Sequence, residues 1–128
     1  MAKRLLEKDI EINGFISSPA LRAITTCTYF AKAYGKKESD IITYNDLYNA
    51  RPLIFLKAIK NANEALNSIA IFAHNPGITE FANELTDTKI DDMPTCGIFA
   101  IKAEIEHWKD FESAEKTFWF FDYPKAKD

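Results

Sequence analysis

Residues 68–77 read SIAIFAHNPG, an apolar run that ends abruptly in a polar, turn-forming stretch. Residues 69–73 show no polar alternation, which predicts a strand covered on both faces in the middle of a parallel sheet. Residues 75–77 predict a turn, and a helical pattern follows them. In open α/β sheets, ligands bind at the carboxyl ends of the strands, where a helix N-terminus offers N–H groups to an anion. His74 is therefore a candidate site residue, the alternative being a histidine that only ends a strand.

The composition fits one ordinary globular domain spanning residues 1–128. Its hydrophobic share is 47% and its charged share 27%, and the net charge of −3 leaves no basic field that would hold nucleic acid. No apolar stretch is long enough to span a bilayer, so we expect no membrane association. Cys27 and Cys96 are too few for a disulfide scaffold and lack metal-site spacing. We therefore expect a cytoplasmic protein with no metal and no cofactor.

Helical and extended patterns alternate over the first two thirds of the chain, which predicts an α/β fold with parallel strands. Ser18 is a natural N-cap and Pro19 suits the first position of the helix that follows. That helix should bury Ala20, Ile24, Cys27, Ala31 and Tyr34, and the helix over 51–61 should bury Leu53, Leu56, Ile59 and Ala62. The expected elements are a helix ending near Asp9, a strand at 15–18, a helix over 19–34, a peripheral strand at 41–44, a helix over 51–61, a strand at 69–73 and a helix from 78.

The last third of the chain no longer alternates between helical and extended patterns. Strand patterns at 97–103 and 116–121 are separated by a short link without a long amphipathic pattern, which predicts an antiparallel hairpin and hence a mixed sheet. Residues 118–121 are aromatic and apolar throughout. A nucleic-acid platform would interleave Lys or Arg with these rings, so we interpret them as core.

A second strand-to-helix junction carries Arg22, one turn inside the predicted helix 19–34. The guanidinium could swing back over the end of strand 15–18, although a surface arginine is the simpler alternative. Two segments, SSPALRA at 17–23 and AHNPG at 73–77, now stand together. They resemble the corresponding segments of the histidine phosphatase superfamily, specifically its small SixA-type phosphohistidine phosphatase branch. LYNA at 47–50, MPTCG at 93–97 and YPK at 123–125 look like further segments of that branch, so the resemblance covers essentially the whole chain.

The resemblance implies a three-layer α/β/α sandwich on a mixed, mostly parallel sheet. It also implies phosphoryl transfer to a histidine and hydrolysis of the resulting phosphohistidine by water, without a cofactor. By match of motif, Arg22 would clamp phosphoryl oxygens and His74 would donate to them, roles that suit the chemistry of both side chains. Asn75 and Gly77, in the turn, would complete the phosphate-binding set. Ser17 and Ser18 are interpreted as capping and shaping residues rather than nucleophiles.

One departure from the family pattern matters most. The nucleophile of that family belongs to an Arg-His-Gly motif at the end of the first strand, and these 128 residues contain no such motif. The other histidine, His107, sits in an acidic link and does not match it. The pattern predicts that Met1 lies inside the helix that follows the nucleophile, so that the first strand is absent from this chain. Asp46 is a candidate general acid, the alternative being a solvated surface residue.

Three functions follow. The first is a phosphohistidine phosphatase-like domain, inactive as given, acting on a phosphohistidine protein or a small phosphorylated molecule. The second is a non-catalytic phosphate- or phosphopeptide-binding module, and the third a structural fragment with a disrupted pocket. Loss of a central strand should leave unpaired edges or an apolar slot beside residues 69–73, and we expect a homodimer in response.

Overall fold

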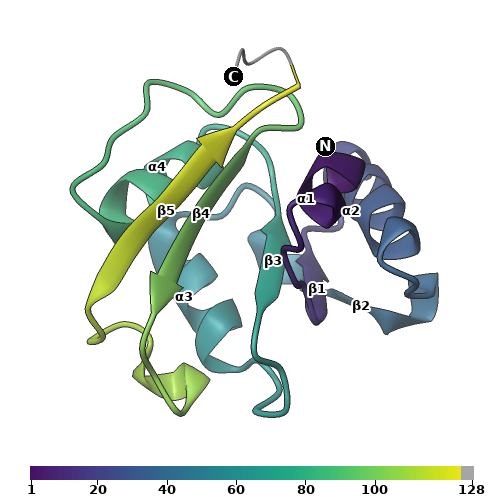
Figure 1. Cartoon of the computed structure of the whole chain (residues 1–128). Helices are drawn as coiled ribbons and strands as arrows, with labels where there is room; N and C mark the ends of the chain where they lie inside the picture. The colour runs from purple at the N-terminus through teal and green to yellow at the C-terminus, as the bar shows by residue number, and fades with distance from the viewer. Residues whose placement is uncertain (125–128) are drawn as a thin grey trace.

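The computed structural model describes residues 1–124 and has an α/β fold (Figure 1). Lys125, which ends the YPK segment, lies outside the described residues. The helices are α1 (Ala2–Glu7), α2 (Leu21–Ala33), α3 (Pro52–Lys60) and α4 (Gly77–Leu85), with short 3-10 turns η1 (Glu38–Asp40), η2 (Asn45–Leu47) and η3 (Trp108–Asp110). The strands are β1 (Gly14–Ser17), β2 (Ile41–Thr43), β3 (Ile69–Phe72), β4 (Ile98–Ala103) and β5 (Lys116–Asp122). No helix within residues 1–124 is long and apolar enough to cross a membrane.

A three-stranded parallel sheet in the order β2-β1-β3 organises the first two thirds of the chain, and the predicted parallel direction of the strands is confirmed. Every residue of β1 is buried, because successive side chains enter two cores on opposite faces. Phe15 packs in a core with Leu5, Cys27 and Phe30 from α1 and α2. Ile16 packs in the other core with Phe55 from α3 and Phe81 from α4, whose rings stack at 4.8 Å. We call these helices and strands the parallel half.

Burial in the first core changes the chemistry of one side chain. Cys27 is fully buried in α2, and this desolvation raises the pKa of its thiol to about 12. Cys96 is exposed, and both cysteines are free thiols.

Two helix predictions need correction. Helix α2 begins at Leu21 rather than at Pro19, because Ser18 Oγ accepts the N–H of Ala20 (3.1 Å) and closes a turn before the helix starts. The predicted buried face of α3 is wrong at Leu53, which is 60% exposed, whereas Phe55, Ala58 and Ile59 are buried. Pro52 does occupy the first position of α3, as expected from its missing N–H.

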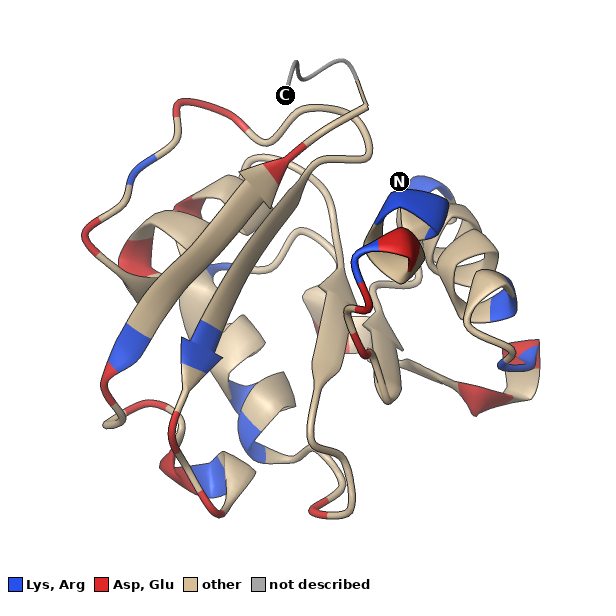
Figure 2. Cartoon of the chain, in the orientation of Figure 1, with Lys and Arg blue, Asp and Glu red and all other residues tan. Residues whose placement is uncertain are grey.

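The sheet is not a single mixed one. Strands β4 and β5 form the predicted antiparallel hairpin, but they make a separate two-stranded sheet, and β3 is an edge strand rather than a central one. Residues of β3 are accordingly half-buried instead of covered on both faces. Apolar side chains, not a backbone ladder, hold the hairpin: Ile98 and Phe120 pack against the first core and Ile101 against the second. We call β4, η3 and β5 the hairpin half; its strands are uncharged along most of their length (Figure 2).

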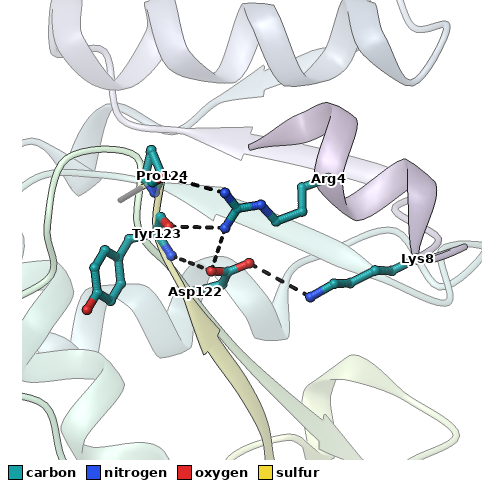
Figure 3. A network of polar contacts seen from close by, with 5 residues as sticks. All are labelled: Arg4, Lys8, Asp122, Tyr123 and Pro124. Atoms are coloured by element: carbon teal, nitrogen blue, oxygen red, sulfur yellow. Dashed lines mark hydrogen bonds and ion pairs between the residues drawn. The ribbon is translucent and has the colours of Figure 1, made fainter. Parts of the chain in front are cut away.

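An ionic clasp also joins the two halves (Figure 3). Arg4 of α1 donates to Asp122 Oδ1 at the end of β5 (2.8 Å) and to the carbonyl of Tyr123 (3.1 Å), and Lys8 lies 3.9 Å from the same carboxylate. Burial acts to raise the pKa of Asp122, but the hydrogen bonds from Arg4 and from the N–H of Tyr123, together with the charges of Arg4 and Lys8, lower it on balance. The carboxylate is therefore ionised at neutral pH.

Candidate functional site

A cleft of about 1890 Å³ lies between the parallel half and the hairpin half, and we call it the central cleft. One wall is β3 and the other is β4, with side chains from the helices above and below. Its lining includes Arg22, which follows β1, and His74, which follows β3. Since β1 and β3 are parallel, the carboxyl ends of both strands meet at one end of the cleft. The two strand-to-helix junctions therefore lie at one edge of the parallel sheet.

Arg22 is the second residue of α2 and is exposed. Among residues 1–124 its guanidinium has neither an ion-pair partner nor a hydrogen-bond partner. The turn that positions it is rigid, because Ser17 and Ser18 are fully buried and Ser17 Oγ donates to the Ser18 carbonyl (2.8 Å). The serine hydroxyls are thus engaged in the turn, which fits their interpretation as shaping residues. The guanidinium keeps all its donors for a ligand.

His74 is held from one side. Its Nε2 lies 3.0 Å from Oδ1 of Asn49, and its ring meets the Tyr48 ring edge-on at 5.8 Å. Its Nδ1 is buried and has no partner among the described residues. With Asn49 as the acceptor, Nε2 carries the proton, and a protonated imidazole would donate from Nδ1 as well. The ring is therefore oriented by the protein and has one nitrogen without a committed contact.

Asn49 is the contact that sequence reasoning missed. The segment 47–50 resembles a segment of the family, but its sequence alone gives none of its residues a role. The available signal is conformational: Asn49 has φ 54°, in the left-handed region that asparagine tolerates better than most residues. That geometry turns its side chain towards the ring of His74.

Asn75 is exposed, but its side chain is committed to the neighbouring loop. Its Nδ2 donates to the carbonyl of Met93 (2.9 Å), and its Oδ1 accepts from the hydroxyl of Thr79. That hydroxyl in turn accepts the N–H of Met93 (2.9 Å). The loop that leads to β4 is thereby tied to the start of α4, so the side chain of Asn75 acts here as a positioning group.

Gly77 is the first residue of α4 rather than part of the turn before it. A Cβ at this position would lie 2.2 Å from the backbone carbonyl oxygen of Ala50. Glycine is therefore required for the close approach of α4 to the segment that carries Asn49. Gly77 does not line the central cleft, and its part in phosphate binding stays a prediction.

The remaining predicted groups lie elsewhere. Asp46 is exposed in η2 and does not line the cleft, so its role as an acid also stays a prediction. His107 does line the cleft, but it precedes η3 and lies 3.4 Å from Glu64 in the loop before β3. It is thus at the amino end of β3, whereas His74 is at the carboxyl end. Within residues 1–124 no group of three or more His, Cys, Asp or Glu side chains is placed to hold a metal ion.

Comparison of the chain with protein-family models, with curated proteins and with solved structures found no match. The class of ligand that this site suits is therefore inferred from the geometry of its side chains. An uncommitted guanidinium and an oriented imidazole, from two different junctions, line one end of one cleft. Such a pair suits a tetrahedral oxyanion better than an apolar or a cationic ligand.

Proposed function

We propose that this chain is a SixA-type, histidine-phosphatase-like domain that binds a phosphoryl group between Arg22 and His74 at one end of the central cleft. The observation that carries the proposal is that both residues come from segments that resemble the family and that both line one cleft. The proposed architecture is the family's three-layer α/β/α sandwich, built on the three-stranded parallel sheet and the separate two-stranded antiparallel sheet.

In this proposal Arg22 binds two phosphoryl oxygens through its planar fork, and the absence of an internal partner leaves that fork available. His74 donates to a third oxygen from Nε2, which exchanges its contact with Asn49 Oδ1 for the ligand, because Nδ1 is buried. Both groups stabilise charge that spreads over the equatorial oxygens during phosphoryl transfer. The backbone N–H groups of Asn75 and Gly77, on either side of Pro76, add donors at the N-terminus of α4. The ligand is a phosphohistidine protein or a small phosphorylated molecule, and the proposed location is the cytoplasm.

One observation favours the non-catalytic alternative for these 128 residues. Covalent chemistry needs a histidine in line with the phosphorus, opposite the leaving group. In this proposal neither histidine takes that part: His74 is assigned as a donor, and His107 lies at the other end of β3, 3.4 Å from Glu64. The chain as given is therefore proposed to bind phosphoryl groups without turning them over, as a phosphate- or phosphopeptide-binding module.

The test is a rapid-quench assay with a labelled phosphohistidine peptide. We expect the peptide to bind, to be displaced by orthovanadate, and to be released unhydrolysed, with no label trapped on the protein. Binding should be lost in the double variant Arg22→Ala, His74→Ala and kept in Lys32→Ala, which removes an exposed charge from the last turn of the same helix. Robust turnover that disappears in His74→Ala would make His74 the nucleophile and overturn the assignment of roles.

A second test uses the DNA sequence upstream of the Met1 codon. If an in-frame Arg-His-Gly segment is encoded upstream of Met1, the longer chain should hydrolyse the peptide and trap phosphohistidine in that segment. His74→Ala should then lower turnover by about 10²–10³-fold, the usual cost of losing one donor to a developing oxyanion. A longer chain that neither binds nor hydrolyses the peptide would contradict the phosphatase assignment.

A further inference from the structure

One dipeptide at the start of β1 is chemically labile. Asn13 is the one asparagine in the sequence that is followed by a glycine, Gly14. Asparagine is a thermolabile residue. It deamidates fastest before glycine, because no side chain hinders attack of the next backbone nitrogen on the amide carbon and the backbone is free to close the ring. An Asn-Gly pair often indicates a turn, but here Gly14 is the first residue of β1 and its φ is not in the left-handed region.

Packing explains the glycine instead. A Cβ on Gly14 would lie 2.5 Å from Cδ1 of Leu66 and 3.2 Å from Cγ2 of Ile69. Glycine therefore lets the loop before β3 lie close against the start of β1. The labile pair is a consequence of this close approach.

The segment 67–68 holds both groups that would react. The N–H of Gly14 donates to the carbonyl of Ser68 (3.0 Å), and Oδ1 of Asn13 accepts the N–H of Asn67 (3.0 Å). The N–H of Asn13 donates to the carbonyl (3.1 Å) and to Oγ (3.0 Å) of Ser68. We call these four contacts the 67–68 clamp. The attacking nitrogen and the amide that it must attack are thus bonded to one loop, so opening of that loop frees both.

We propose that Asn13 is a site of spontaneous deamidation that the 67–68 clamp keeps closed in the folded chain and that reacts when the amino ends of β1 and β3 separate. Asn67 is exposed and Asn13 half-buried, so water and hydroxide reach the pair once the clamp opens. The Gly14 nitrogen loses its proton to solvent base and bonds to Cγ of Asn13, and the Cγ–Nδ2 bond breaks to release ammonia. Water then opens the resulting succinimide at either carbonyl and leaves aspartate or isoaspartate.

The two products should affect the fold differently. Aspartate keeps Oδ1 as an acceptor for the N–H of Asn67 and leaves the main chain unchanged. Isoaspartate routes the main chain through Cγ, which adds one atom and moves Gly14 from its place opposite Ile69. β1 is buried along its whole length between two cores, so a displaced strand cannot repack. Prolonged opening at this point therefore makes unfolding irreversible. The inference does not depend on the oxyanion site.

The test compares the full chain with a free peptide of residues 9–22 in the same mildly alkaline buffer. Trypsin releases this segment from the protein, and the segment contains no other asparagine and no glutamine, so its gain in mass reports Asn13 alone. We expect deamidation to be at least about 100-fold slower in the folded chain, the factor for a clamp that is open about 1% of the time. The protection factor of the Gly14 amide in hydrogen exchange should have the same value, because both reactions require its N–H to leave the Ser68 carbonyl.

A second measurement tests the consequence for folding. In guanidinium chloride above the unfolding transition, the chain should deamidate at the rate of the peptide. After dilution, wild type should have lost the ability to refold in proportion to its isoaspartate content. Asn13→Asp, whose carboxylate is a far poorer target for the same attack, should refold fully after the same incubation.

Three results would overturn the proposal. Deamidation of the folded chain at the rate of the peptide would mean that the clamp does not protect Asn13. A slowing that differs from the protection factor of the Gly14 amide would mean that another opening controls the reaction. Full refolding of chains that carry isoaspartate would contradict the predicted effect on β1. The rate comparison uses wild type alone, so it decides the proposal even if Asn13→Asp is unstable.

Discussion

The parallel half and the hairpin half are built from similarly apolar strands, yet they are stabilised differently. In the parallel half, β1 is buried along its whole length, and helices close both faces of the sheet. In the hairpin half, no residue of β4 or β5 is buried, and attachment depends on a few side chains and the Arg4–Asp122 clasp. The difference teaches that the parallel half holds most of the stability and carries both candidate site residues, Arg22 and His74, while the hairpin half supplies one wall of the central cleft.

The largest effect should come from emptying the core of the parallel half. Phe55 is fully buried and stacks on Phe81, so Phe55→Ala should lower the free energy of unfolding by about 3–5 kcal/mol. Trp119 of β5 is 44% exposed, and Trp119→Ala should cost no more than about 1 kcal/mol. Urea denaturation of both variants gives the two values. Equal losses of unfolding free energy in the two variants would contradict the claim that the parallel half holds most of the stability.

A smaller effect is expected from a methyl group at the start of α4. Alanine in place of a helical glycine usually stabilises by roughly 1 kcal/mol, but the Cβ of Gly77→Ala would meet the carbonyl of Ala50 at 2.2 Å. Overpacking should dominate and lower the free energy of unfolding by about 1–3 kcal/mol, with a shift in the His74 ring resonances. Gly97→Ala, where the Cβ meets Pro94 at 2.8 Å in the loop before β4, should cost less because only that loop has to move. A more damaging Gly97→Ala would contradict this ranking.

The clasp between the halves should contribute least to stability. Arg4→Ala removes charged hydrogen bonds at a partly exposed site and should cost about 1 kcal/mol at neutral pH, whereas Lys3→Ala, an exposed lysine on the same helix, should have no measurable effect. The pKa of Asp122 is lower in the folded state than in the unfolded one. Its stabilisation is therefore complete above the ordinary aspartate pKa and is lost as pH falls through the lowered value. Thermal unfolding of wild type and Arg4→Ala should converge as the pH falls below that lowered pKa; a constant difference at every pH would exclude the clasp as the cause.

Sequence reasoning succeeded where local patterns decide the structure and failed where tertiary pairing does. The apolar run at 69–73 predicted β3 and its parallel direction, and Pro52 predicted the start of α3, since both depend on neighbours in the chain. The edge position of β3 could not be predicted from the same run, because a fully covered strand and an edge strand beside an apolar cleft have the same composition. The slot beside these residues was expected from the resemblance, and the structure has a cleft there.

The candidate site shows the same division. The presence of Arg22 and His74 in the lining of one cleft follows from two junctions in parallel strands, which a sequence can reveal. The partner of His74 could not be found in this way. Asn49 reaches the imidazole only because the chain adopts a left-handed conformation after η2 and because Gly77 lets α4 approach. Such contacts depend on the path of the backbone in three dimensions rather than on spacing along the chain.

The central claim is that Arg22 and His74 together hold a phosphoryl oxyanion, and titration of orthovanadate followed by amide and imidazole resonances tests it most directly. We predict saturable binding in the millimolar range, with shifts confined to the starts of α2 and α4 and to the His74 ring. Affinity should fall in Arg22→Lys, which lacks the planar fork, and vanish in Arg22→Ala, His74→Ala, while His107→Ala and Lys32→Ala bind as wild type. Equal binding by the double variant and the wild type would contradict the claim.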